Sequence, residues 1–189
     1  KMSAKTLSIK TNIYGNKSQN NIDWSKAPGE EIWTSRNINE MYQMGIEIQG
    51  QLQPIQHAQW KDLHLKVGYR YGYVSKTSGD YDSRYVLDYL QHKVVLSAYL
   101  PIYKRLDLTI VSNFQDRAGS YTDWDAANMA YQHEFEPFWL IDLKLRYKLG
   151  NAKIFVDVSN LFNQEYADIG QVWQPGRWVR FGGDFSITR

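Results

Sequence analysis

Apolar and polar residues alternate one by one along most of this 189-residue chain. The clearest case is the segment 139–149, where Trp139, Ile141 and Leu143 begin an apolar set and Asp142 and Lys144 lie between them. A period of two puts successive side chains on opposite faces of a β-strand. Eight segments share the pattern and are predicted to be strands: 7–14, 43–52, 63–73, 92–100, 106–114, 139–149, 154–159 and 179–188. The chain is therefore predicted to be all-β and antiparallel.

The composition restricts the classes of protein that fit this pattern. Aromatic residues make up 15% of the chain, with 14 Tyr and 7 Trp, and both types favour places where one end is apolar and the other wet. The mean hydropathy is −0.55, and no stretch approaches the roughly 18 apolar residues of a membrane helix. A transmembrane β-barrel remains compatible, because only every second strand residue must be apolar. Periodicity alone leaves a soluble sandwich or a lipocalin-like barrel open as well.

The lengths of the connections favour the membrane barrel. Short connections follow the second, fourth and sixth segments, at 53–59, 101–105 and 150–152. Long polar connections follow the first, third, fifth and seventh, at 15–36, 75–85, 116–137 and 163–176. Outer-membrane barrels have short periplasmic turns and long extracellular loops, whereas a sandwich has no reason to alternate in this way.

The polar face of the predicted strands carries many charges. In a membrane barrel these side chains would line the lumen, while the apolar face would meet lipid and aromatic residues would gather near the strand ends. The charged residues expected in the lumen wall are Glu47, Lys66, Arg70, Asp142, Lys144, Arg146, Asp157, Arg180 and Asp184.

Several motifs resemble those of TonB-dependent outer-membrane receptors. Near the C-terminus, "IFVDVSNLFNQEYADIGQVWQPGRWVRFGGDFSI" resembles the signature of that family. A second match is "NINEMYQMGIEIQGQL", and "NFQDRAG" at 113–119 fits a strand exit. The residues that carry the resemblance, with a structural role expected for each, are Gly45, Glu47, Asn160, Leu161, Phe162, Tyr166, Gly176 and Arg177.

The resemblance implies a fold and a function. The barrels of this family have about 22 strands and a plugged lumen, so residues 1–189 are expected to be the C-terminal portion, roughly the last third, with the plug and the N-terminal strands absent. The intact protein would lie in the bacterial outer membrane, in contact with its lipid. It would take up a ferric siderophore, haem or cobalamin type of complex, with the TonB system acting through the plug.

Other interpretations remain open. An independent eight-stranded outer-membrane barrel, acting as an anchor or a narrow pore, is the main alternative, since eight is an allowed closed count. A soluble lipocalin-like carrier and an outer-membrane lipid enzyme are weaker. A signal peptide directly before Lys1 in the full gene would favour the small barrel.

No chemistry is expected from the chain itself. Cysteine is absent, which excludes a disulfide framework and thiol catalysis. The four histidines, His57, His64, His92 and His133, lack metal-ligand spacing, and no nucleophile elbow or phosphate loop is present. The net charge of +2, without clustered Lys and Arg, does not suggest nucleic acid. We therefore expect no enzyme activity, no cofactor and no bound metal.

Ligand contact is expected from the long connections, because exposed aromatic and Arg residues are enriched at recognition sites. The candidates are Tyr81, Arg84, Tyr121, Trp124, Trp173 and Arg177. The Asn-Leu-Phe run at 160–162 is expected to build a strand end. Phe162 continues an outward-facing set, and Asn160 would be redirected by a turn, because Asn tolerates the left-handed conformation.

Overall fold

The computed structural model describes residues 6–27, 29–30, 32–53, 62–76, 82–83, 89–124, 130–169 and 172–186. These residues form strands, turns and loops, with no helix among them. Eight long strands run in an antiparallel meander: β1 (Thr6–Lys26), β2 (Thr34–Gln53), β3 (His64–Lys76), β5 (Leu90–Tyr103), β6 (Leu106–Arg117), β9 (Phe138–Leu149), β10 (Ala152–Ser159) and β13 (Trp178–Phe185). The predicted all-β, antiparallel fold is confirmed.

Five short strands lie within the connections: β4 (Asp82–Ser83), β7 (Ser120–Trp124), β8 (Ala130–Glu134), β11 (Ala167–Ile169) and β12 (Val172–Trp173). The main sheet has the order β13-β10-β9-β6-β5-β3-β2-β1-β4, so each long strand pairs with the long strand that follows it in the chain. The strands β7 and β8 form a separate hairpin, and so do β11 and β12.

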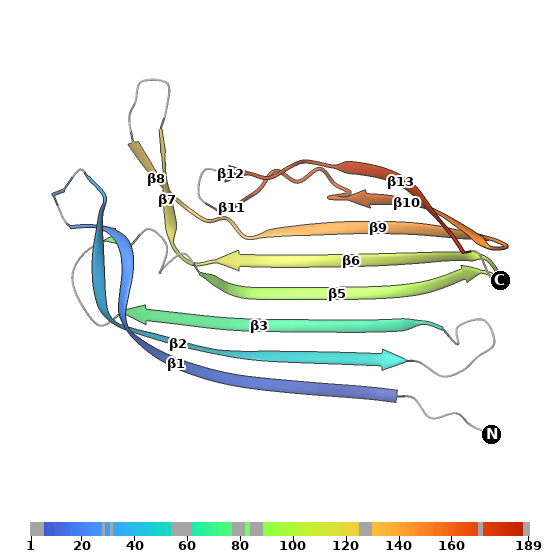
Figure 1. The fold of residues 1–189 in the computed structure, drawn as a ribbon, viewed down its shortest axis with the longest axis horizontal. Coiled ribbons are helices and arrows are strands. Elements are labelled where there is room, and N and C mark those ends of the chain that lie inside the picture. The colour runs from blue at the N-terminus through green and yellow to red at the C-terminus, as the bar shows by residue number, and fades with distance from the viewer. Residues whose placement is uncertain are drawn as a thin grey trace.

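The two shortest connections and the longest ones lie at opposite ends of the sheet (Figure 1). The two-residue turns 104–105 and 150–151 lie at one end, together with the first residues of β1 and the last of β13. The β1–β2 hairpin tip, β7–β8 and β11–β12 lie at the other, which we call the loop end. The predicted segregation therefore holds for the two-residue turns and for the long connections after β3, β6 and β10. The β2–β3 connection, residues 54–63, is longer than predicted and longer than the β1–β2 connection, residues 27–33.

The first predicted connection was wrong in its extent. Residues 15–36 were expected to be a long polar loop, but β1 and β2 stay in register from Thr6↔Gln53 to Ser25↔Thr34. Polar side chains occupy both faces of this extension, so it carries no period-two signal, although its backbone is paired as in any strand. The two short hairpins at the loop end lack the signal for the same reason.

One face of the sheet is apolar from edge to edge. A single cross-strand row consists only of apolar residues: Leu7, Leu52, Leu65, Ala98, Ile110, Leu143, Val158 and Val179. Large side chains on this face are exposed, such as Ile13 at 76% and Phe181 at 78%. Among the described residues, Phe135 and Phe138 are the buried hydrophobic ones. A single layer with an apolar face needs something other than water against that face.

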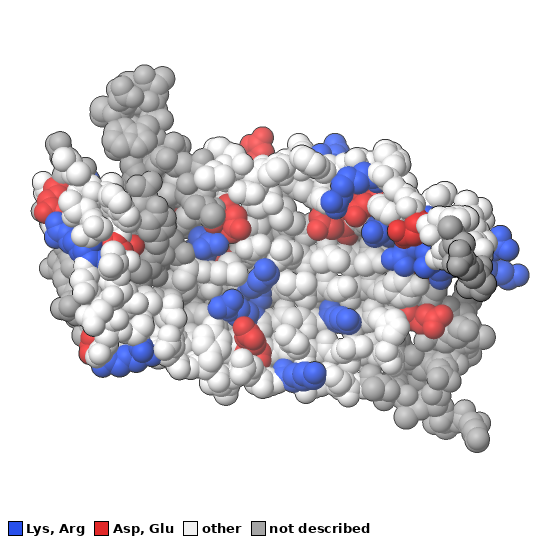
Figure 2. Space-filling model, viewed as in Figure 1, with Lys and Arg blue, Asp and Glu red and all other residues white. Residues whose placement is uncertain are grey.

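The opposite face is polar, and Figure 2 shows Lys, Arg, Asp and Glu side chains scattered along it. All nine charged residues predicted for the lumen wall occupy this face, because each alternates with residues of the apolar face. Several pair across strands: Arg180 with Asp157 at 3.3 Å, and Arg70 with Glu47 at 3.7 Å. These exposed pairs satisfy the charges and add little stability.

The outward-facing sets of the long strands match the height of a membrane's apolar layer. Strands of membrane barrels tilt by roughly 40° from the barrel axis. At that tilt the outward-facing set of β9, Trp139 to Leu149, spans ~26 Å of height, close to the ≈25 Å apolar band of a membrane barrel.

Candidate functional site

The loop end holds most of the residues proposed for ligand contact. Tyr121 lies on β7, Trp173 on β12, and Arg177 immediately before β13. Tyr81 and Arg84 lie outside the described residues, and Trp124 belongs to β7 but its side chain is not among those described. The three that can be placed come from two different connections, β6–β9 and β10–β13.

Tyr121 is part of an aromatic cluster at the base of the β7–β8 hairpin. Its ring centroid lies 5.8 Å from that of His133 and 5.2 Å from that of Phe135. Phe135 is only 7% exposed, and the guanidinium of Arg117 lies 5.7 Å from its ring centroid. Arg117 precedes the β7–β8 hairpin and Phe135 follows it, so this cation–π contact holds the two ends of the hairpin together. Trp173, in contrast, is 65% exposed.

Two contacts join the β6–β9 connection to the β10–β13 connection. Arg117 forms an ion pair with Asp168 at 2.8 Å, and the rings of Phe138 and Tyr166 lie 4.5 Å apart. Burial raises the pKa of Tyr166, and the nearby Asp168 and Asp142 carboxylates raise it further, so this hydroxyl stays neutral at physiological pH. The family-signature residue Tyr166 therefore packs the two loops together.

The Asn-Leu-Phe run follows β10, and Asn160 lies at the start of a hydrogen-bonded turn there. Asn160 has a φ of 50° and is 5% exposed. Its side-chain amide donates to the Gln164 carbonyl at 2.8 Å, and its Oδ1 accepts the Gln164 N–H at 2.8 Å. The Asn160 N–H donates to Asp142 of β9 at 2.8 Å. The Asn160 side chain is therefore turned away from the apolar face, and its two bonds to Gln164 make a closed hydrogen-bonded loop. Phe162, in contrast, is 72% exposed.

Arg177 and Gly176 close the same turn from the other side of the connection. The Arg177 N–H donates to Asn163 Oδ1 at 2.8 Å, and its guanidinium donates to the Leu161 carbonyl at 3.4 Å. A Cβ at Gly176 would overlap Asn163 Oδ1, which explains the glycine. Arg177 therefore has a structural contact in addition to the ligand contact predicted for it.

The second signature, around Gly45, is also built by packing. The Tyr14 side chain of β1 lies across Gly45 of β2, where a Cβ would overlap its hydroxyl and the Tyr71 carbonyl. Arg70 donates to the Tyr14 hydroxyl at 3.1 Å and pairs with Glu47. An aromatic ring that packs over a cross-strand glycine shields backbone atoms that would otherwise be exposed to solvent, and it fixes the register of the two strands.

The sequence did not reveal the contacts that organise the loop end. Arg117 and Asp168 are 51 residues apart, and nothing in either segment indicates the other. Phe138 directly precedes the predicted strand 139–149, and no sequence pattern indicates its contact with Tyr166. Among the described residues, no group of three or more His, Cys, Asp or Glu is arranged to hold a metal ion. Within the same residues, no helix has the length and apolarity to cross a membrane.

Comparison with known proteins supplies the family. The family model for the TonB-dependent receptor-like β-barrel matches residues 1–161. The chain belongs to this family of transport receptors. The eight long strands, their short and long connections and the opposed apolar and polar faces are thus those of a TonB-dependent receptor barrel.

Solved structures of TonB-dependent receptors share the fold at low identity. The pyoverdine outer-membrane receptor FpvA of Pseudomonas aeruginosa is 14% identical with a TM-score of 0.70, over 96% of this chain and 27% of that one. The copper transporter OprC is 16% identical with a TM-score of 0.66, over 96% and 29%. The ferric-catecholate import receptor Fiu of Escherichia coli K12 is 17% identical with a TM-score of 0.65, over 95% and 25%. The chain thus spans between 25% and 29% of the length of these receptors. No curated protein matches it.

Proposed function

We propose that this chain is the C-terminal part of an outer-membrane receptor for TonB-dependent uptake of a scarce nutrient complex. The observation that carries the proposal is the pair of open sheet edges. β13 forms one edge of the main sheet, and β1 is the last long strand at the other. Within the described residues, β1 pairs on its outer side only with the two-residue β4, at Ser25 and Lys26. Each unpaired backbone group in lipid costs several kcal/mol, so both edges call for further strands.

The open edges also bear on the alternative of an independent eight-stranded barrel. Such a barrel would close by pairing its first and last strands. In the part of the chain that the structure describes, β13 pairs with β10 alone and β1 with β2 and β4. Further strands of a larger barrel would supply both partners. The plug, and with it the contact to the TonB system, would belong to the same longer polypeptide.

The cargo we propose is a ferric siderophore, haem or cobalamin type of complex. Support comes from the similar structures, which include a receptor bound to pyoverdine, a ferric-catecholate import receptor and the FrpB iron transporter of Neisseria meningitidis. The residues proposed to contact the cargo from the loop end are Tyr81, Arg84, Tyr121, Trp124, Trp173 and Arg177.

The test is uptake by the intact gene product in its own host. Cells with and without the gene would be starved of iron and offered radiolabelled ferric catecholate, ferric hydroxamate, haem or cobalamin. We expect uptake of one class to disappear on deletion of the gene and, equally, on loss of TonB. Equal uptake by deleted and intact strains for every cargo would contradict the proposal.

The reading frame upstream of Lys1 tests the partial-chain proposal separately. We expect several hundred further residues with strand repeats, a plug and a signal peptide. A signal peptide directly before Lys1 would instead support the eight-stranded barrel. The isolated chain would then be tested for heat-modifiable folding in detergent and for pore conductance.

A further inference from the structure

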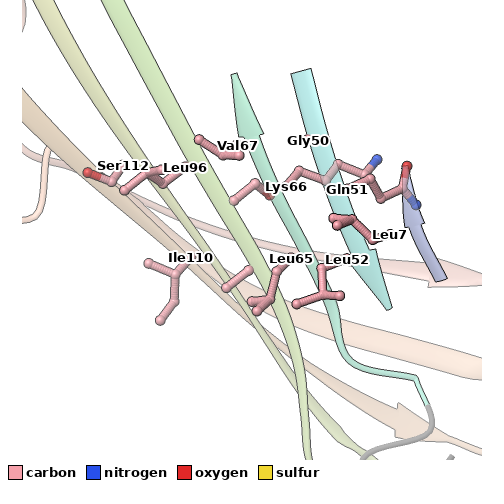
Figure 3. A pocket seen from close by; sticks show the side chains of 12 residues that line it. Leu7, Gly50, Gln51, Leu52, Leu65, Lys66, Val67, Leu96, Ile110 and Ser112 are labelled. Atoms are coloured by element: carbon pink, nitrogen blue, oxygen red, sulfur yellow. The ribbon is translucent and has the colours of Figure 1, made fainter. Parts of the chain in front are cut away.

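A groove of about 570 Å³ interrupts the apolar face of the sheet. Figure 3 shows Leu65, Val67, Leu96 and Ile110 around it, on β3, β5 and β6. The volume is within the range of pockets that hold small ligands. The apolar side chains that line it come from two neighbouring rows of the apolar face, one through Leu52, Leu65 and Ile110 and the next through Val67 and Leu96. Gln51, Lys66 and Ser97 of the row between them also border the groove, although they alternate to the polar face.

Small residues create the groove. Ala98 stands between Leu65 and Ile110 in one row, and Ser112 follows Leu96 in the next. At these two positions the side chains are too short to reach the level of their neighbours. Gly50, in the row of Ser112, also borders the groove. The result is a depression with aliphatic walls.

The groove has a basic turn at the end of the same hairpin. β5 and β6 carry Ala98 and Ser112 and are joined by Lys104 and Arg105, both exposed. From Ala98 to Lys104 the strand runs ~20 Å, which projects to ~15 Å at a tilt of roughly 40°. That depth is about half of a ≈30 Å hydrocarbon core. A lipid whose headgroup lies at the turn would therefore reach the groove with the end of its acyl chain.

We propose that the groove binds one acyl chain of a phospholipid from the periplasmic leaflet, with its phosphate held by Lys104 and Arg105. The groove is continuous with the lipid-facing surface of the barrel. The two cations in the turn at the periplasmic end of the same hairpin complement an anionic phosphate. The proposal depends on the orientation of the barrel and is independent of the cargo, so a failure to find uptake would leave it unaffected.

The experiment uses the intact receptor, purified in detergent and titrated with palmitoyl-oleoyl phosphatidylglycerol. Native mass spectrometry counts the lipids retained. Ala98→Leu fills the groove, and Ala152→Leu makes the same change on the same face at the β9–β10 turn. We expect Ala98→Leu to weaken retention of the first lipid about tenfold, because each methylene that loses its apolar contact weakens binding severalfold. Ala152→Leu should leave retention unchanged.

The headgroup contact has its own variants. Lys104→Gln with Arg105→Gln should also lower retention, while Lys153→Gln, an exposed lysine beside the other short turn, should not. Equal retention by Ala98→Leu and Ala152→Leu overturns the groove as a lipid site. Unchanged retention by the Lys104–Arg105 variant overturns the phosphate contact. Heat-modifiable migration of each variant on electrophoresis shows that its barrel has assembled.

Discussion

At the scale of single residues, the family signatures are positions where one side chain makes a strand end or a register possible. Asn160 combines a left-handed backbone with a buried amide whose donor and acceptor are both used by Gln164. Asn is among the few residues other than glycine that accept this conformation. The residue type follows from both requirements together, since glycine would satisfy only the first.

Replacement of Asn160 should therefore destabilise the C-terminal strands. Asn160→Ala removes both side-chain hydrogen bonds and puts a methyl-bearing residue at a φ of 50°, and we expect a loss of about 2–4 kcal/mol. Asn160→Gly should recover part of this, because only the hydrogen bonds are lost. Urea unfolding of the intact barrel measures both, with Asn151→Ala in an exposed turn as the control. Equal stability of all three variants would argue against the closed hydrogen-bonded loop.

Phe155 and Gly182 form a second ring-over-glycine pair, across β10 and β13. A Cβ at Gly182 would overlap the Phe155 ring, and the Nζ of Lys144 lies over that ring, 4.1 Å from its centroid. We expect Gly182→Ala to cost about 1–3 kcal/mol in an otherwise unchanged barrel. In a Phe155→Ala background the same change should cost much less, since the ring that it displaces is gone. A double-mutant cycle of unfolding free energies measures the difference, and additive effects would show that the contact does not matter.

At the scale of elements, β1 and β2 continue as a paired hairpin above the apolar band. Lys17 and Glu40 form an ion pair at 2.8 Å, and Tyr42 and Gln19 also donate to Glu40. Hydrogen bonds from Lys17, Tyr42 and Gln19 lower the pKa of Glu40, and the bond to Glu40 raises the pKa of Lys17. These are exposed groups, so their role is to order the extension rather than to stabilise the barrel.

The pH dependence of this hairpin follows from those directions. A lowered Glu40 pKa stabilises the hairpin above the ordinary value of 4.5, and the effect is lost as pH falls through the lowered pKa. The raised Lys17 pKa stabilises it below 10.5, and the effect is lost as pH rises through the raised pKa. We expect the backbone amides of residues 16–22 to lose hydrogen-exchange protection below about pH 4. Their exchange should then be faster than the intrinsic pH dependence of amide exchange predicts. Glu40→Gln should remove this acid-dependent step, and its persistence in that variant would assign it to another group.

At the scale of the whole molecule, the sheet separates two environments. One face presents apolar rows over ~26 Å of height, and the other presents paired charges. Such an arrangement is stable only when lipid covers the first face and water or protein the second. In a family of membrane barrels the buried core of a globular protein is replaced by the bilayer, which accounts for the few buried hydrophobic residues.

Arginine scanning of one strand tests which face meets lipid. Leu108 and Val111 lie on opposite faces of β6, in rows with Leu145 and with Asp142 respectively. Leu108→Arg should destabilise the intact barrel by about 1–3 kcal/mol, the cost of a charge between the midplane and the interface. Val111→Arg should cost under about 1 kcal/mol, because it reaches the polar face beside Asp142. Equal effects would mean that the two faces meet the same medium.

The sequence by itself determined the strands wherever one face meets lipid, because only there does burial impose a period of two. It also determined the order of short and long connections and, through residues such as Asn160 and Gly45, the family. The tertiary structure alone decided the paired extension of β1 and β2, since strands with water on both faces carry no alternation. It alone decided that Arg117 meets Asp168 and that Tyr14 covers Gly45. Contacts between distant segments depend on register and tilt, which are set by the whole sheet rather than by either segment.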